Sequence, residues 1–218
     1  MNNFIILLIV ATLLAKVPII NLPLVWFETF FHELSHMLVA LLTGGEVFSL
    51  KLFWTGAGVC RVRGGVFVLI AAAGYLGAPI WGGWLYNIGK DSTSRELALY
   101  KIRILIILLI MSTILWVRDG NTLLIIGFML GILSLVALHI DSPDSRLFIR
   151  FCGIYVMLNA IHSPLYLYSH KIPWDDGVAL AQVTDLPKFL FIALWCAFAL
   201  VALISVVYVP WALGKEVS

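Results

Sequence analysis

Two histidines and a glutamate, His32, Glu33 and His36, are the residues whose types and spacing best support chemistry. Residues four apart on an α-helix are offset by about 40° around its axis, so the two imidazoles share one face and can bind one metal ion. The carboxylate of Glu33, next to the first histidine, can reach a water molecule beside that metal and act as a general base. The sequence HELSH at 32–36 therefore predicts a helical zinc site that activates water.

An alternative interpretation is that these side chains form helix–helix hydrogen bonds inside a packed core. The residues on either side of the motif, 27–31 and 37–42, are mostly apolar and compatible with a helix. A charged carboxylate at the centre of a membrane-spanning helix costs about 2.5–3.5 kcal/mol on insertion scales, so ionisable residues at this depth are functional candidates. We therefore favour the metal site over the packing role.

The composition of the chain indicates a membrane protein. Of its 218 residues, 62% are hydrophobic and only 12% are charged, whereas a soluble domain carries roughly 25% charged residues. So few polar residues cannot cover a surface in water, and the bilayer must act as the solvent. A net charge of +2 is too small to suggest a nucleic-acid partner, and the three cysteines form no CxxC pair. We expect one membrane-embedded domain over residues 1–218.

Several apolar runs approach the length of about 20 residues that a membrane-spanning helix needs. They lie at roughly 3–20, 24–43, 66–88, 102–117, 121–140, 150–168 and 189–210. The first run is short and contains Pro18, so the sequence predicts six or seven spans and leaves open whether this run crosses the membrane. No basic residue precedes it and no small-x-small cleavage site precedes Lys16, which favours a retained helix over a signal peptide. Lysine and arginine divide almost evenly between alternate loops, so they indicate no orientation.

The stretch 44–65 differs from the apolar runs. It is bracketed by glycine pairs and partly alternates apolar with polar residues, which predicts a small β-hairpin at about 46–63. A strand edge cannot face lipid, so the hairpin must pack on protein or lie at the interface. The next run, 66–88, is rich in glycine and alanine, which favours a closely packed central helix. The expected fold is an all-α polytopic membrane protein with a β-hairpin insertion.

A catalytic zinc needs a third protein ligand and an open position for water. The remaining histidines are His139, His162 and His170, and the chain has seven aspartates. Among these aspartates only the pair Asp175 and Asp176, followed by Gly177, forms a concentrated acidic turn near a long apolar run. Residue types alone leave the choice of the third ligand open.

Four features together resemble the site-2 protease family, and in particular its compact bacterial and plant-type branch of intramembrane zinc metallopeptidases. They are the HELSH helix, the turn Thr43-Gly44-Gly45-Glu46-Val47, the small-residue segment Gly74-Tyr75-Leu76-Gly77 and the late Asp175-Asp176-Gly177. The resemblance covers roughly residues 24–187. The first motif is highly specific, and the late Asp-Gly motif is moderately so.

The resemblance implies that both motif histidines and a late aspartate bind Zn²⁺, with Glu33 as the base. The family's ligand aspartate directly precedes a glycine, which implies that the ligands here are His32, His36 and Asp176. Asp175 is the alternative third ligand.

The family also has asparagine and proline residues upstream of its Asp-Gly pair. Here Asn159 and Pro164 lie at a longer spacing than the common pattern. Asn159 is therefore a candidate for an oxyanion or cavity-lining role, with a helix–helix hydrogen bond as the competing role. His162 is close to it in sequence and is a candidate to line the cavity, or equally a packed polar residue.

The function that follows from the resemblance is hydrolysis of peptide bonds in or next to transmembrane segments of membrane-protein substrates. The expected partners are such a substrate and the lipid bilayer, with no nucleic acid; the sequence does not indicate the substrate's identity or the oligomeric state. A catalytically inactive zinc-binding scaffold is one alternative, although it would not need the complete HExxH. A metal transporter is a weaker one, because only one apolar segment carries paired histidines and no internal repeat is evident.

Overall fold

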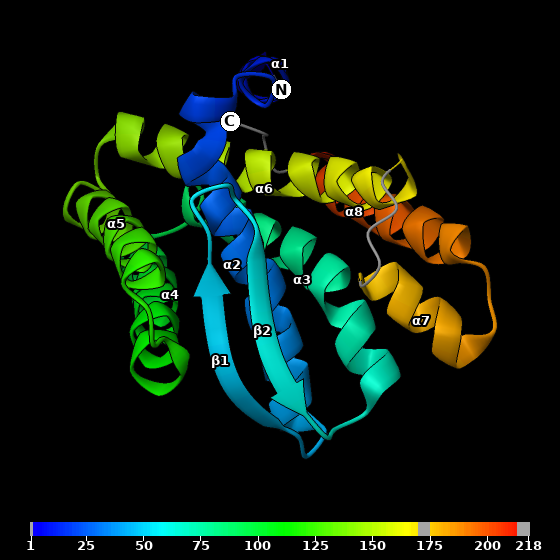
Figure 1. Ribbon diagram of the computed structural model, residues 1–218. Helices are drawn as coiled ribbons and strands as arrows, with labels where there is room; N and C mark the ends of the chain where they lie inside the picture. The colour runs from blue at the N-terminus through cyan, green and yellow to red at the C-terminus, as the bar shows by residue number, and fades with distance from the viewer. Residues whose placement is uncertain (1, 170–174, 213–218) are drawn as a thin grey trace.

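The structure is a helical assembly with one hairpin lying along its second helix (Figure 1). This computed structural model describes residues 2–169 and 175–212. In chain order the elements are α1 (Asn2–Leu14), α2 (Pro18–Leu42), β1 (Glu46–Leu52), β2 (Gly58–Arg63), α3 (Phe67–Ile88), α4 (Arg95–Trp116), α5 (Gly120–Leu138), α6 (Pro143–Ser169), α7 (Asp176–Thr184) and α8 (Lys188–Ala212). The predicted fold class, all-α with a hairpin at 46–63, is confirmed.

Five helices, α3, α4, α5, α6 and α8, are long and apolar enough to cross a membrane. The pair α1 and α2 passes the same test together but is bent by 112° at the break between the two helices, which gives up to six spans. The bend is explained by Pro18, because the residue before a proline avoids helical geometry and Val17 is extended. The runs 3–20 and 24–43, which the sequence separates, thus form one bent unit, and the residues that the structure describes hold no seventh span.

The spans differ in how far the protein covers them. Only 28–33% of the apolar stretches of α4, α5 and α8 is buried, compared with 50% in α3 and 56% in α6. The outer helices therefore expose large aliphatic side chains that only lipid can solvate. The chain is an integral, multi-pass membrane protein whose centre is formed by α3 and α6.

The crossing of α3 and α6 explains the small residues of the predicted central helix. A Cβ atom on Gly153 of α6 would lie 2.4 Å from the backbone nitrogen of Tyr86 and 2.6 Å from the carbonyl oxygen of Gly82, both in α3. The two backbones therefore touch directly, as small residues at a membrane helix interface allow. This contact fixes α6 against α3.

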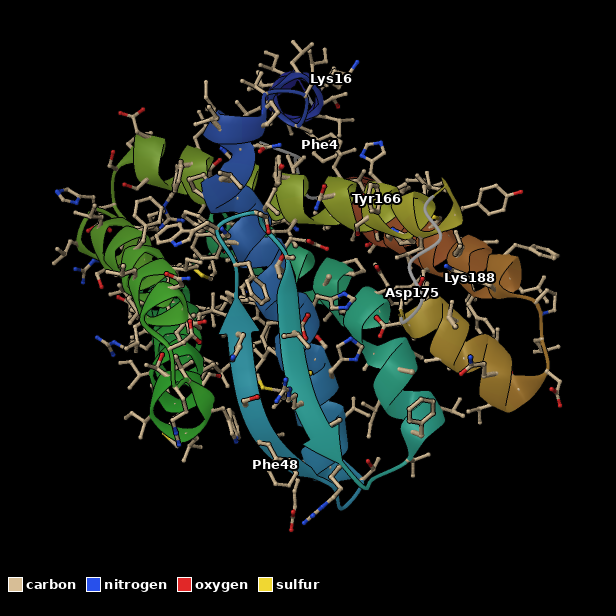
Figure 2. All side chains as sticks on the ribbon, viewed as in Figure 1. Phe4, Lys16, Phe48, Tyr166, Asp175 and Lys188 are labelled. Carbon is tan, nitrogen blue, oxygen red and sulfur yellow. The ribbon has the colours of Figure 1, made fainter. Side chains whose placement is uncertain are left out.

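The hairpin packs on protein, as a strand edge in a membrane must. Its antiparallel register runs from the pair Glu46–Arg63 to the pair Leu52–Gly58, with an irregularity in β1 beside Phe48. Strand β1 contacts α2, α4 and α5, whereas β2 contacts α2. The hydroxyl of Thr29 donates to the carbonyl of Gly56 at 2.6 Å and ties the turn to α2, while Phe48 lies at the exposed opposite end (Figure 2). In the described residues no third strand pairs with the outer edge of β2.

Candidate metal centre

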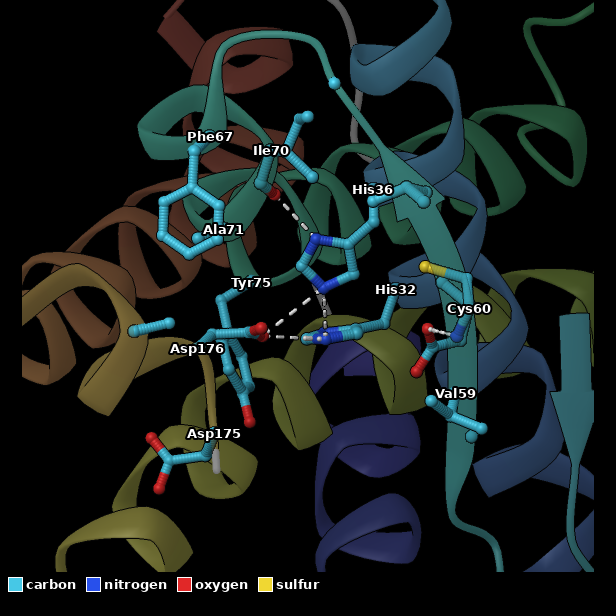
Figure 3. A pocket seen from close by; sticks show the side chains of 15 residues that line it. His32, His36, Val59, Cys60, Phe67, Ile70, Ala71, Tyr75, Asp175 and Asp176 are labelled. Carbon is cyan, nitrogen blue, oxygen red and sulfur yellow. Dashed lines mark hydrogen bonds and ion pairs between the residues drawn. The ribbon is translucent and has the colours of Figure 1, made fainter. Parts of the chain in front are cut away.

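The side chains of His32, His36 and Asp176 converge in the space between α2, α3 and the start of α7 (Figure 3). The two histidine Nε2 atoms are 2.9 Å apart. The Asp176 Oδ2 atom lies 3.2 Å from Nε2 of His32 and 3.3 Å from Nε2 of His36. Residues separated by most of the chain thus present two nitrogen ligands and one oxygen ligand to a single point.

These separations fit a tetrahedral zinc ion. With metal–ligand bonds of about 2.0–2.1 Å, two ligand atoms at a tetrahedral angle are about 3.3 Å apart. The three observed separations lie between 2.9 and 3.3 Å. Two imidazoles and one carboxylate also form a known donor set for catalytic zinc, with the fourth position left open. The residues present therefore fit the metal that the sequence motif predicts.

The orientation of the His36 ring is fixed by a hydrogen bond between its second ring nitrogen, Nδ1, and α3. Its Nδ1 lies 2.6 Å from the backbone carbonyl oxygen of Ile70. A carbonyl oxygen can only accept, so Nδ1 must carry the proton and Nε2 keeps its lone pair toward the site. Such outer hydrogen bonds orient metal-binding histidines in many proteins. One turn of α3 thus fixes both the direction and the tautomer of this ligand.

Gly74 forms the wall of the site on α3. A Cβ atom at this position would lie 2.4 Å from Cε1 and Nε2 of His32 and 2.5 Å from Nε2 of His36. The imidazoles therefore occupy the volume that any larger side chain would fill. The ring of the next residue, Tyr75, stands edge-on to the His32 ring at a centroid distance of 4.5 Å.

Glu33 lies on the other side of the site, against β2. Its Oε2 atom accepts a 2.7 Å hydrogen bond from the backbone N–H of Cys60. The side chain is nearly buried, and a Cβ atom on Gly58 would lie 3.0 Å from its Oε1 atom. Burial raises the pKa of the Cys60 thiol, and the neighbouring Glu33 carboxylate raises it further. The cysteine therefore stays protonated and offers no thiolate nucleophile.

A cavity of about 420 Å³ opens in front of these residues. Its lining includes the converging His32, His36 and Asp176 together with Glu33. Apolar side chains complete the lining, among them Val59 and Val62 of β2, Phe67, Ile70 and Ala71 of α3, and Ala179 of α7. The cavity therefore joins a candidate metal site and a carboxylate to an apolar surface next to a strand edge.

The two aspartates of the acidic turn have different surroundings. Asp175 is the N-cap of α7 and its carboxylate points away from the histidines, whereas that of Asp176 points toward them (Figure 3). Asp175 Oδ2 is instead 2.6 Å from the ammonium of Lys188. Burial alone would raise the pKa of the Asp176 carboxyl, but the positive charge that His36 and His32 carry when protonated outweighs burial and holds that pKa well below its usual value. Asp176 therefore completes the group with the two histidines, and Asp175 does not join it.

The other sequence candidates lie away from the centre. The amide of Asn159 donates to the buried carboxylate of Glu28 at 3.2 Å, which is the helix–helix hydrogen bond that competes with an oxyanion role. His162 is exposed on α6, and neither residue lines the cavity. His139 caps the end of α5 and bonds to the carbonyl of Leu135. His170, the remaining histidine, lies outside the described residues.

Sequence reasoning missed several groups that shape the centre. The Ile70 carbonyl and the Cys60 N–H are backbone groups, which no residue type reveals. Gly74 was part of the small-residue segment that resembles the family, but the run that contains it was interpreted as helix packing and not as a wall of the site. Lys188 lies at the start of a long apolar run, where a lysine ordinarily reaches the membrane interface, so its pairing with Asp175 was not indicated by the sequence.

Comparison with known proteins agrees with this geometry. The sequence matches the family described as Peptidase M50B-like over residues 4–206. Neither a curated protein nor a solved structure matches the chain significantly. The matched range contains every residue of the candidate centre. It also contains the candidate membrane spans, the last of which ends at Val206. The chain therefore belongs to the Peptidase M50B-like family, within the site-2 protease group of intramembrane metallopeptidases.

Proposed function

We propose that this protein is a zinc-dependent endopeptidase that cleaves peptide bonds in or next to transmembrane segments of other membrane proteins. The observation that carries the proposal is the convergence of His32, His36 and Asp176 at the spacing of zinc ligands, with the three atoms 2.9–3.3 Å from one another. Glu33 shares the same cavity. A packing role for the histidines would not require a carboxylate from a distant turn to complete the group.

Zinc held by these three residues would supply Lewis-acid activation of the water nucleophile and of the scissile carbonyl. Glu33 takes the proton that the water loses when its oxygen attacks the carbonyl carbon. The same carboxyl then gives that proton to the amide nitrogen as the carbon–nitrogen bond breaks, which yields a carboxylic acid and an amine. The Cys60 N–H, bonded to Oε2, holds the carboxylate in place and leaves Oε1 for proton transfer.

The edge of β2 is the surface that we assign to the substrate. A helical substrate shields its own carbonyls, so it must unwind locally before cleavage, and an unwound segment can pair with a free strand edge. The N–H of Cys60 points away from β1 toward Glu33, and backbone groups along a strand alternate between its two edges. The N–H and C=O groups of Gly58 and Val62 therefore share the outer edge, and Val62 lines the cavity.

Metal content and cleavage, measured on the same purified protein, test this proposal. We expect one zinc per chain, cleavage of some members of a panel of single-span peptides in proteoliposomes, loss of cleavage with a chelator and recovery with added zinc. His32→Ala should lose both zinc and cleavage, since it removes one of three ligands. His139→Ala, far from the centre at the end of α5, should keep both.

The alternatives give different results in this assay. Zinc binding without cleavage of any peptide in the panel would contradict the enzyme and favour the scaffold. Zinc flux into the proteoliposomes, lost in His32→Ala, would favour the transporter. Wild-type protein that binds no zinc would overturn the proposal in all its forms.

Removing the outward N–H of Val62 should weaken substrate binding. Val62→Pro deletes one donor on an edge where proline is tolerated, and one hydrogen bond contributes about 0.5–1.5 kcal/mol. We expect kcat/KM to fall roughly three- to tenfold, with unchanged zinc content. Val62→Ala shortens the side chain but keeps the N–H, so it is the matched control. Equal kcat/KM in the two variants would exclude pairing at this residue.

A further inference from the structure

We propose that Lys188 is a positioning residue for the metal ligand Asp176 and acts on it through Asp175. The inference rests on the proposed zinc-dependent function and extends it to a residue that does not touch the cavity. Its basis is a partly buried ion pair: Lys188 Nζ lies 2.6 Å from Asp175 Oδ2, and the Asp175 side chain is only 7% exposed, whereas that of Lys188 is 23% exposed. Figure 2 shows the two side chains close together between α7 and α8.

The carboxylate of Asp175 fixes the start of α7 with both of its oxygens. Oδ1 accepts a 2.9 Å hydrogen bond from the backbone N–H of Val178, which is the capping bond of the helix. Oδ2 accepts a 2.6 Å hydrogen bond from the ammonium of Lys188. Asp176 is the first residue of α7. A cap held by an ion pair therefore sets the direction in which the Asp176 side chain leaves the helix.

Lys188 joins three helices at this point. It is the first residue of α8, and its ammonium also donates to the carbonyl of Leu167 in α6 at 2.9 Å. Its aliphatic stem lies against Gly177 of α7, where a Cβ atom would be 3.0 Å from Cγ and 3.1 Å from Cε of the lysine. The side chain thus ties the start of α7 to α6 and α8. Among the described residues, the other partner of the Asp175 carboxylate is the backbone N–H of Val178 in its own helix.

Removing Lys188 would leave the Asp175 carboxylate without the cation that it pairs with. The loss of its counter-ion is unfavourable for this buried carboxylate. Asp175 would move toward water or toward another cation, and the cap would move with it. Because Asp176 follows in the chain, its carboxylate would leave the ligand position. Changes in the outer shell of a metal site typically weaken metal affinity about 10–100-fold.

The test measures zinc affinity by competition with a chromogenic chelator and thermal unfolding of the metal-free protein. Lys188→Met should weaken zinc affinity about 10–100-fold, and Lys188→Arg should recover part of the loss. Lys101→Met, a lysine in the first turns of another span, α4, is the matched control and should bind zinc as the wild type does. Asp175→Ala removes the cap and the ion pair and should also weaken zinc binding.

The double variant decides whether Lys188 acts through Asp175. If it does, Lys188→Met combined with Asp175→Ala should bind zinc no more weakly than Asp175→Ala alone. Additive losses, or wild-type zinc affinity in folded Lys188→Met, would overturn the inference while leaving the proposed function intact. Reduced stability of the metal-free protein with unchanged zinc affinity would also overturn it, because the lysine would then only stabilise the fold. Wild-type protein without zinc affinity would overturn the proposed function and this inference together.

Discussion

Glu33→Gln is expected to abolish peptide cleavage while leaving zinc bound. Glutamine has the same size, and its carbonyl oxygen can still accept the 2.7 Å hydrogen bond from Cys60 N–H. It cannot take a proton from water at neutral pH, and a positioned general base contributes about 10²–10⁴-fold to a rate. We therefore expect kcat to fall by about that factor, measured with a cleavable single-span peptide, at unchanged zinc stoichiometry.

Glu28 of the same helix provides the matched control for this substitution. Its carboxylate is also buried, but it accepts hydrogen bonds from Asn159 and Ser163 of α6 and does not line the cavity. Glu28→Gln keeps one oxygen that accepts from Asn159, and its NH2 group can donate to the Ser163 hydroxyl, so cleavage should stay within a few-fold of wild type. A Glu33→Gln variant that cleaves as fast as Glu28→Gln would exclude Glu33 as the base.

The contrast between the two glutamates also separates the enzyme from a zinc-binding scaffold. A scaffold needs the three ligands but has no use for a carboxylate beside them, so Glu33→Gln would leave its binding of partners unchanged. In an enzyme the same substitution removes the proton transfer and nothing else. The buried hydrogen bond to Cys60 shows that the chain holds this carboxylate at a defined place.

Local features of the fold could be predicted from sequence because their causes are local. The spacing of His32 and His36 requires only a helix, and α2 supplies it. The glycine pairs that bracket 44–65 and the alternation between them predict a hairpin at about 46–63. The observed strands span the same range. The small residues of 66–88 predict a central helix. They are needed there because the backbones of α3 and α6 touch at Gly82 and Gly153.

Features that depend on distant partners could not be predicted in the same way. Asp175 and Asp176 are adjacent and chemically identical, and their different directions depend on Lys188 in the next span. The tautomer of His36 depends on a carbonyl of α3, which has no signature in the sequence. The span count also differs in detail, because the 112° bend between α1 and α2 combines two apolar runs into one unit.

Gly74→Ala is expected to abolish zinc binding and cleavage together. The added methyl group would lie 2.4–2.5 Å from ring atoms of His32 and His36, well inside contact distance. The His36 ring cannot turn aside without breaking its 2.6 Å hydrogen bond to Ile70. We expect zinc affinity to fall about 100-fold or more, beyond the usual effect of an outer-shell change, because the ligand atoms themselves are displaced.

Gly83→Ala in the same helix is the matched control, since a Cβ atom there has nothing within 4 Å. Alanine favours a helix over glycine by about 1 kcal/mol, so Gly83→Ala should leave α3 intact or slightly more stable, whereas in Gly74→Ala the clash with the histidine rings opposes this gain. A loss of zinc in Gly74→Ala with normal binding in Gly83→Ala therefore has a steric cause at the metal centre. Wild-type zinc affinity in Gly74→Ala would mean that the histidines do not converge beside α3, and the third ligand would then have to be sought elsewhere.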